Sequence, residues 1–89
     1  MNDNWNIMTR HPNQPHFSPL WNEGMNEIEA RLEFRARLRD SYYDLHNIEQ
    51  QLVTDYSYHY EHYDTTRQDG TTRRRLKVIV DGWKAVTDG

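Results

Sequence analysis

Two histidines, His59 and His62, lie three residues apart in a tyrosine-rich run and are the first candidates for metal or acid–base chemistry. Residues three apart share a face on a helix, but side chains alternate on a β-strand, so there the two rings point to opposite sides. The order His-Tyr-Glu-His also differs from the His-Glu-x-x-His of zinc proteases. Since no cysteine can supply a thiolate ligand, we expect no metal ion and no other cofactor.

Nucleophilic catalysis requires a serine, threonine or cysteine beside a base. The chain has three serines without an elbow motif, and its four glycines do not cluster into a phosphate-binding loop. A small, polar, tyrosine-rich chain also offers no deep core in which to enclose an active site. We therefore expect a protein that is not an enzyme.

Basic residues close to a tyrosine are the next candidates, because they suit phosphate contact and base stacking. Beside Tyr63 the sequence has five of them: Arg67, Arg73, Arg74, Arg75 and Lys77. Strand alternation divides this set, with Arg73 and Arg75 on one face and Arg74 on the other. The whole chain also has a net charge of −3. Nucleic-acid binding through this Arg/Tyr face is therefore the alternative function, and the less favoured one.

An acidic block precedes these basic residues. Between Asp40 and Asp64 there are six carboxylates, Asp55 among them, and no lysine or arginine. An acidic protein of this kind can imitate the phosphates of a nucleic acid and occupy a basic groove on a partner. The simpler interpretation is that the acidic and basic runs neutralise each other across a β-hairpin.

Tyrosine, tryptophan and arginine dominate the hot spots of protein interfaces, and this chain has six tyrosines and three tryptophans. We expect a small accessory or inhibitory protein that binds another protein, of the kind that phages and mobile elements encode. The candidate partner-binding residues are Trp5, Tyr63, Arg73, Arg75, Asp55 and Asp64.

The totals indicate a single small domain over 1–89 with a thin core, since only 35% of the residues are hydrophobic. A homodimer would help to stabilise so small a core. The absence of cysteine is compatible with a cytoplasmic setting. No apolar run approaches the ~20 residues of a membrane span, so we expect no membrane association.

The stretch from Tyr56 to Val80 predicts a β-hairpin, because two β-prone runs flank Gln68-Asp69-Gly70. The loop has three residues and ends in a glycine with a positive φ, so it pairs Arg67 with Thr71. The numbers of any two residues that face each other across the hairpin then add up to 138. One face is then apolar, with Tyr60 opposite Val78, and the other pairs Glu61 with Lys77, Tyr63 with Arg75 and Thr65 with Arg73. A one-residue slip would place Glu61 against Val78. Helical spacing up to Tyr63 leaves a continuous helix as the rival interpretation.

The remaining segments complete an α+β prediction. We expect an irregular arm over 1–18, in which Trp5 and Ile7 could form a short edge strand and which docks on the core. A helical region follows over 19–53, starting at Ser18-Pro19 or Asn22, either as one long helix or as two with a break near Asp40. Its apolar stripe of Met25, Ile28 and Leu32 is the candidate dimer contact. Asp81-Gly82 predicts a tight turn and a third strand, so that 54–87 forms a three-stranded antiparallel meander.

Overall fold

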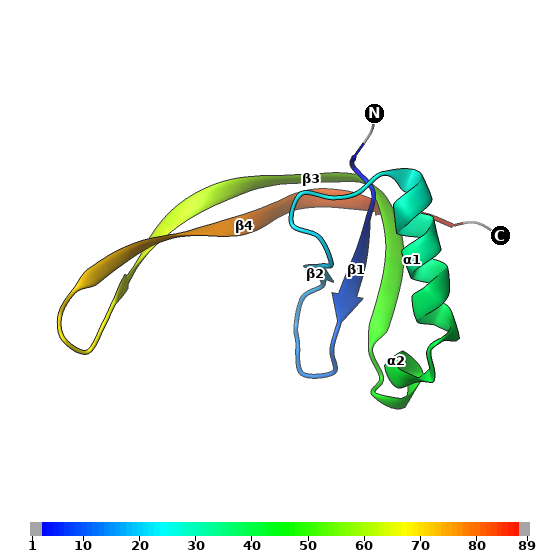
Figure 1. The fold of residues 1–89 in the computed structure, drawn as a ribbon, viewed down its shortest axis with the longest axis horizontal. Coiled ribbons are helices and arrows are strands. Elements are labelled where there is room, and N and C mark those ends of the chain that lie inside the picture. Colours follow the sequence, from blue (N-terminus) through cyan, green and yellow to red (C-terminus); the bar gives the residue numbers. More distant parts are fainter. Residues whose placement is uncertain (1–2, 88–89) are drawn as a thin grey trace.

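The computed structural model describes residues 3–87, and two residues at each end lie outside this range. In chain order the elements are β1 (Asn6–Arg10), β2 (Ser18–Pro19), α1 (Glu27–Arg39), α2 (Ser41–Leu45), β3 (Glu49–Thr66) and β4 (Thr72–Ala85). The strands form one antiparallel sheet in the order β2-β1-β3-β4. With α1 lying beside β1 and the first half of β3 (Figure 1), the α+β class is confirmed.

The prediction of an irregular arm over 1–18 is wrong for the amino-terminal segment. The first two residues of that arm lie outside the described range. Its centre forms β1, which pairs with β3 from Asn6↔Val53 to Arg10↔Glu49 and lies inside the sheet, not at its edge. Next to it, Trp5 and Met25 exchange two backbone hydrogen bonds of 3.0 and 2.6 Å. The arm is thus docked on the core, and it supplies part of that core.

Two small clusters make up the core, one on each face of the sheet. Ile7 and Met8 follow each other on β1 and are fully buried, so alternation sends them to opposite faces. The Ile7 cluster contains Ala30 of α1 and Leu52 of β3, whereas Met8 packs with Val53 and Tyr56. Because few side chains are fully buried, each of them contributes a large share of the stability.

The loop before α1 is held by a buried amide. The side chain of Asn6 donates to the Trp21 carbonyl at 2.6 Å and accepts from the Trp21 and Ile7 N–H groups at 3.2 and 2.8 Å. All three of its hydrogen bonds go to backbone groups, and they satisfy an amide that is itself fully buried. Asn6 therefore fixes the course of the chain over one end of the sheet.

The helical region is shorter than the predicted 19–53. α1 begins at Glu27, where the side chain of Asn26 accepts from the Glu29 N–H at 2.9 Å, and not at Ser18 or Asn22. The predicted break is confirmed, since Asp40 accepts from the Tyr42 N–H at 3.0 Å and caps α2. Helix then stops at Leu45, because Asn47 adopts a φ of 55° and turns the chain into β3.

The stripe predicted as a dimer contact lies away from the sheet. Ile28 and Leu32 are 73% and 61% exposed, while α1 packs on the sheet through Ala30 and Phe34. On α1, two ion pairs join residues one turn apart, at 2.8 Å for Arg31–Glu27 and 3.8 Å for Arg37–Glu33. The small, fully buried Ala30 lets the helix approach the sheet closely, and it lies outside the apolar stripe predicted as the dimer contact.

The hairpin prediction is confirmed in type and in register. β3 and β4 pair from Tyr58↔Val80 to Thr66↔Thr72, with Tyr60 opposite Val78 and Glu61 opposite Lys77. The loop closes through the Arg67 N–H, which donates to the Thr71 carbonyl at 2.9 Å, and Gly70 has the predicted positive φ of 87°. The helical interpretation of this stretch is therefore wrong.

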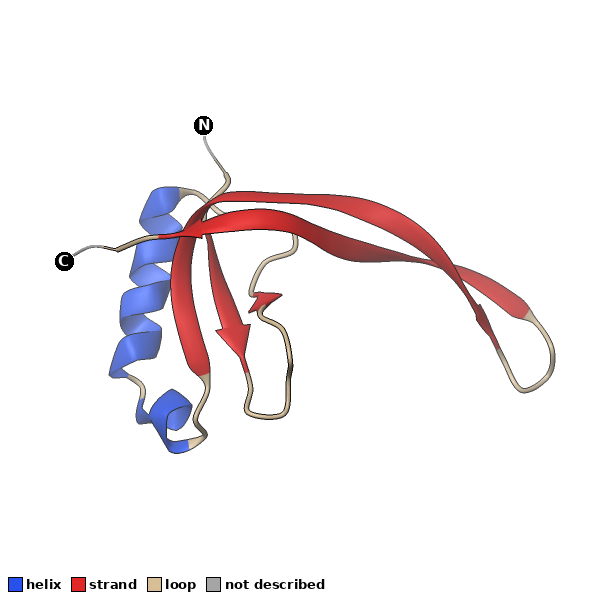
Figure 2. Cartoon of the chain, turned by 180° about the vertical axis from the view of Figure 1, so that it is seen from behind, coloured by secondary structure: helices blue, strands red, loops and turns tan. Residues whose placement is uncertain are grey.

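The prediction of a third strand after a turn at Asp81-Gly82 is wrong. β4 continues through Asp81-Gly82 to Ala85, because β3 extends back to Glu49 and offers partners at Val53 and Thr54. Gly82 instead lies opposite Ser57 at an irregularity of β3, a common place for glycine in a strand. There Asp55 takes a φ of 53°, and the bulged strand bends sharply (Figures 1 and 2).

Candidate interaction surface on the hairpin arm

Beyond this bend, residues 57–82 form a two-stranded ribbon that we call the hairpin arm. Figures 1 and 2 show it projecting from the body formed by α1, α2, β1 and the start of β3. It accounts for much of the 53 Å length of the molecule. A ribbon with no layer on either face leaves its side chains available to other molecules.

One face of the arm begins with a ladder of tyrosines that leaves the core. The rings of Tyr56 and Tyr58, and of Tyr58 and Tyr60, have centroids 5.7 Å apart. The Tyr56 hydroxyl donates to the Asn22 carbonyl at 2.7 Å, and burial, followed by the neighbouring tyrosines, raises the pKa of Tyr56 to about 12. Tyr60 donates to Glu23 at 3.0 Å, which raises its pKa too. The ladder ties the root of the arm to the loop before α1.

Further out, the same face is apolar and uncovered. Tyr60 is 43% exposed and Leu76 is 57% exposed, although the strand pattern places both on the face that continues the core. Val78, opposite Tyr60, is half-buried, and His62 lies opposite Leu76. We call Tyr60, His62, Leu76 and Val78 the apolar arm face.

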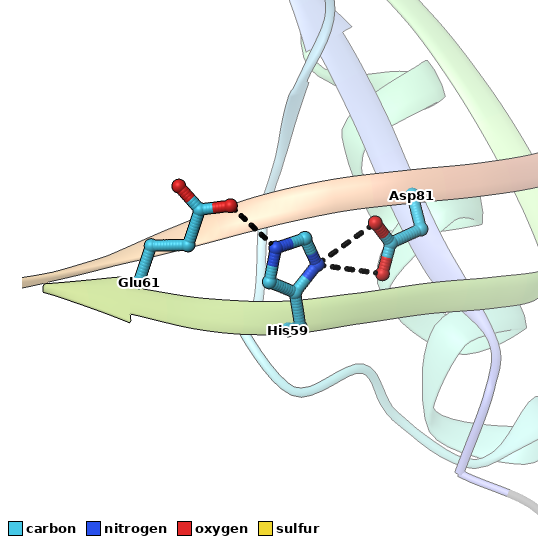
Figure 3. A network of polar contacts seen from close by, with 3 residues as sticks. All are labelled: His59, Glu61 and Asp81. Atoms are coloured by element: carbon cyan, nitrogen blue, oxygen red, sulfur yellow. Dashed lines mark hydrogen bonds and ion pairs between the residues drawn. The ribbon is translucent and has the colours of Figure 1, made fainter.

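The opposite face carries a polar network centred on His59 (Figure 3). Nδ1 lies 2.8 and 2.9 Å from the two carboxylate oxygens of Asp81, and Nε2 lies 2.7 Å from Glu61. Only the protonated ring can donate from both nitrogens. The hydrogen bonds to Asp81 and then to Glu61 therefore raise the pKa of His59. This network joins β3 to β4 near the root of the arm.

We expect an NMR titration to place the pKa of His59 above its usual ~6.5. Asp81→Asn should lower this pKa more than Glu61→Gln, because the Asp81 hydrogen bond is the larger cause. The raised folded-state pKa means that the contribution of the network to stability is fully present below ~6.5 and is lost as the pH rises through the folded value. A His59 pKa that neither substitution changes would show that the network does not form.

The predicted Arg/Tyr residues lie together near the end of the arm. Tyr63 lies opposite Arg75, and Thr65 lies opposite Arg73. The Lys77 ammonium is 5.5 Å from the Tyr63 ring centroid, a cation–π contact. Tyr63, Arg75 and their neighbours Arg73, Arg74 and Leu76 line a shallow, open hollow. The structure therefore brings Tyr63, Arg73 and Arg75 together, as their register predicted.

The other three predicted partner-binding residues lie apart from this group. Trp5 is half-buried against the Ile7 cluster, with the Arg31 guanidinium 5.0 Å from its ring centroid. Asp55 is exposed at the bend, and Asp64 is exposed opposite Arg74 near the end of the arm. Nine residues of strand separate the two acids, roughly 30 Å, so they do not form one acidic patch.

The two histidines lie on opposite faces of β3, as strand alternation requires. Within residues 3–87, no group of three or more histidine, aspartate and glutamate side chains is placed to hold a metal ion. In the same range, no helix is long and apolar enough to cross a membrane.

The role of Asp81 and the tyrosine ladder were not predicted from the sequence. In the predicted register Asp81 is the diagonal neighbour of His59, two residues beyond its partner Ile79, and this spacing could have revealed the pair. Comparison of the chain with protein-family models, with curated proteins and with solved structures found no match.

Proposed function

We propose that this protein is a non-enzymatic binding module, an accessory or inhibitory protein that docks on another protein through the apolar arm face. The main support is the exposure of Leu76 and Tyr60 on the projecting ribbon, where Tyr60 keeps a hydrogen bond to Glu23 of the body. Both side chains are about half exposed, so burying the remainder at an interface would gain roughly 1 kcal/mol for each, before the costs of association. An aromatic and a leucine on a projecting ribbon form a compact anchor for a pocket on a partner.

The charged groups of the arm agree with a binding role better than with a catalytic one. Both ring nitrogens of His59 are engaged by carboxylates, so this histidine is not free to act as a base toward a substrate. The network is also exposed, whereas catalytic groups work in sites that exclude water. The homodimer, the cytoplasmic location and the phage or mobile-element origin stay predictions from the sequence.

Leu76→Glu tests the proposal, with Thr72→Glu as a matched control on the same strand and face. Leu76 is exposed and makes no contact that the fold requires, so we expect both variants to fold as the wild type does. In affinity capture from a nuclease-treated lysate of the source cell, wild type and Thr72→Glu should retain one stoichiometric protein. Leu76→Glu should weaken this binding roughly thirtyfold, the effect of losing a ~2 kcal/mol hot spot.

Two results would contradict the proposal. Capture that nuclease abolishes would mean that a nucleic acid, and not a protein, holds the retained material. Equal losses in the two glutamate variants would mean that added negative charge on the arm matters and the apolar side chain does not.

A further inference from the structure

The last part of the arm, residues 63–75, is a positively charged tip on an acidic protein. It contains four arginines against Asp64 and Asp69, a net charge of +2, whereas the rest of the chain has seven lysines and arginines against twelve acids. Asp69 is tied to the turn, since its carboxylate accepts from the Thr71 N–H and hydroxyl at 3.0 and 2.6 Å. The net charge of the whole chain therefore conceals a basic tip.

The four arginines of this tip differ in their partners from three of the five arginines of the body. In the body, Arg10, Arg31 and Arg37 pair with carboxylates at 2.7 to 3.8 Å. Among residues 3–87, no ion pair within 4 Å involves the tip arginines, which are Arg67, Arg73, Arg74 and Arg75. Even the carboxylate of Glu61, next to the tip, is turned to His59. The tip presents guanidinium groups whose charge the protein itself does not neutralise by contact.

These cations lie on both faces of the ribbon. Arg73 and Arg75 share one face with Tyr63, and Arg74 projects from the other, where it lies opposite Asp64. A flat anionic surface such as a membrane would meet only one face at a time. A groove between two phosphate backbones meets both faces, and the major groove of B-DNA, about 12 Å wide, admits a two-stranded β-ribbon. The deep, narrow major groove of duplex RNA does not.

Distance separates the tip from the acidic body. Arg73 lies eight positions before Asp81, which stands at the root of the arm, and this is roughly 26 Å at the usual rise per residue. At physiological ionic strength the Debye length is about 8 Å, so most of the body's negative charge is screened at the tip. An arm that extends away from the body allows an acidic protein to approach phosphate groups.

From these observations we propose a second binding site: the tip of the arm, residues 63–75, binds duplex DNA by inserting the ribbon into the major groove. Arg73 and Arg75 contact one phosphate backbone, and Arg74 contacts the other. The site adjoins the apolar arm face, because Arg74 lies on the same face of the ribbon as Leu76 and both line one hollow.

Fluorescence anisotropy with a labelled mixed-sequence DNA duplex, measured over a salt series, tests the proposal. We expect the combined Arg73→Gln and Arg75→Gln variant to lose roughly tenfold or more in affinity and to reduce the salt slope by about two. The same positions changed to lysine should keep the slope, because each lysine still neutralises one phosphate. Lys84→Gln removes an exposed cation from β4 near the body and should leave binding unchanged.

Four results would overturn the proposal. The first is an equal loss of DNA affinity in Lys84→Gln and in the double glutamine variant, and the second is tighter binding to single-stranded DNA or duplex RNA than to duplex DNA. The third is competition by phosphatidylserine vesicles that is as effective as competition by unlabelled duplex. The fourth is the absence of duplex binding at the lowest salt concentration. Circular dichroism of each variant shows that the fold is kept. The capture of a protein by the apolar arm face is tested separately, because that experiment uses a nuclease-treated lysate and leaves Arg73, Arg74 and Arg75 unchanged.

Discussion

Gly24→Ala is expected to destabilise the fold by about 3 kcal/mol or more, which is the largest effect among the glycine positions. Gly24 has a φ of 85°, a conformation that is strained for alanine. Its new Cβ would also overlap the Asp3 carbonyl oxygen and lie 3.2 Å from that of Trp5. Neither backbone can easily move aside, since Trp5 is held to Met25 by two hydrogen bonds. Strain and overlap therefore add at this position.

Substitutions at Gly70 and Gly82 allow the cost of backbone strain to be measured apart from the cost of steric overlap. Gly70 has almost the same φ, 87°, but nothing lies within 4 Å of a Cβ there, so Gly70→Ala should cost only about 1 kcal/mol. Gly82 has no such φ, and its nearest neighbour would be the Ser57 hydroxyl at 3.9 Å, so Gly82→Ala should be nearly neutral. Urea denaturation of the three variants gives the order. A loss at Gly24 no larger than that at Gly70 would mean that the loop before α1 does not pack as described.

Ile7→Ala is expected to cost about 3 kcal/mol, because it opens a cavity between α1 and the sheet. Ile7 is fully buried against Ala30 and Leu52, in a core of few residues. The matched control is Ile28→Ala, which deletes the same atoms from a side chain that is 73% exposed. In a monomer this control should change the free energy of unfolding by no more than ~0.5 kcal/mol.

Denaturation of both variants at two protein concentrations checks this prediction. A destabilisation by Ile28→Ala that grows with protein concentration would indicate the predicted homodimer, since subunit binding stabilises by mass action. A small loss for Ile7→Ala would contradict the central place of β1 in the sheet.

The hairpin could be predicted from the sequence because its determinants are local. Gly70 fixes the loop, and only one register puts Tyr60 opposite Val78 while placing Glu61 opposite Lys77. That register alone brought Tyr63 and Arg75 together, so the basic part of the candidate site was also predictable. The register also predicted that the charges of Glu61 and Lys77 would pair, and this was wrong, because Glu61 hydrogen-bonds to His59 and the Lys77 ammonium lies over the Tyr63 ring.

The body was predicted poorly because its determinants are distant in sequence. β1 pairs with residues 39 to 47 positions further along, and no local pattern indicates that Asn6 would become a buried structural amide. Leu45, Ile48 and Leu52 have helical spacing, but pairing with β1 stabilises a strand from Glu49 onward. Once β3 extended that far, the turn signal of Asp81-Gly82 was overridden by backbone pairing along β4.

The division of β3 between two partners has a consequence for the order of folding. Closing the hairpin brings together Thr66 and Thr72, six positions apart, whereas pairing β1 with β3 closes a loop of about 40 residues. By loop-closure entropy alone the second step is about 2 kcal/mol more costly. The arm should therefore zip from its turn toward the bend first, and the strand so formed then offers its free edge to β1. The projecting ribbon would thus serve as the template on which the body assembles.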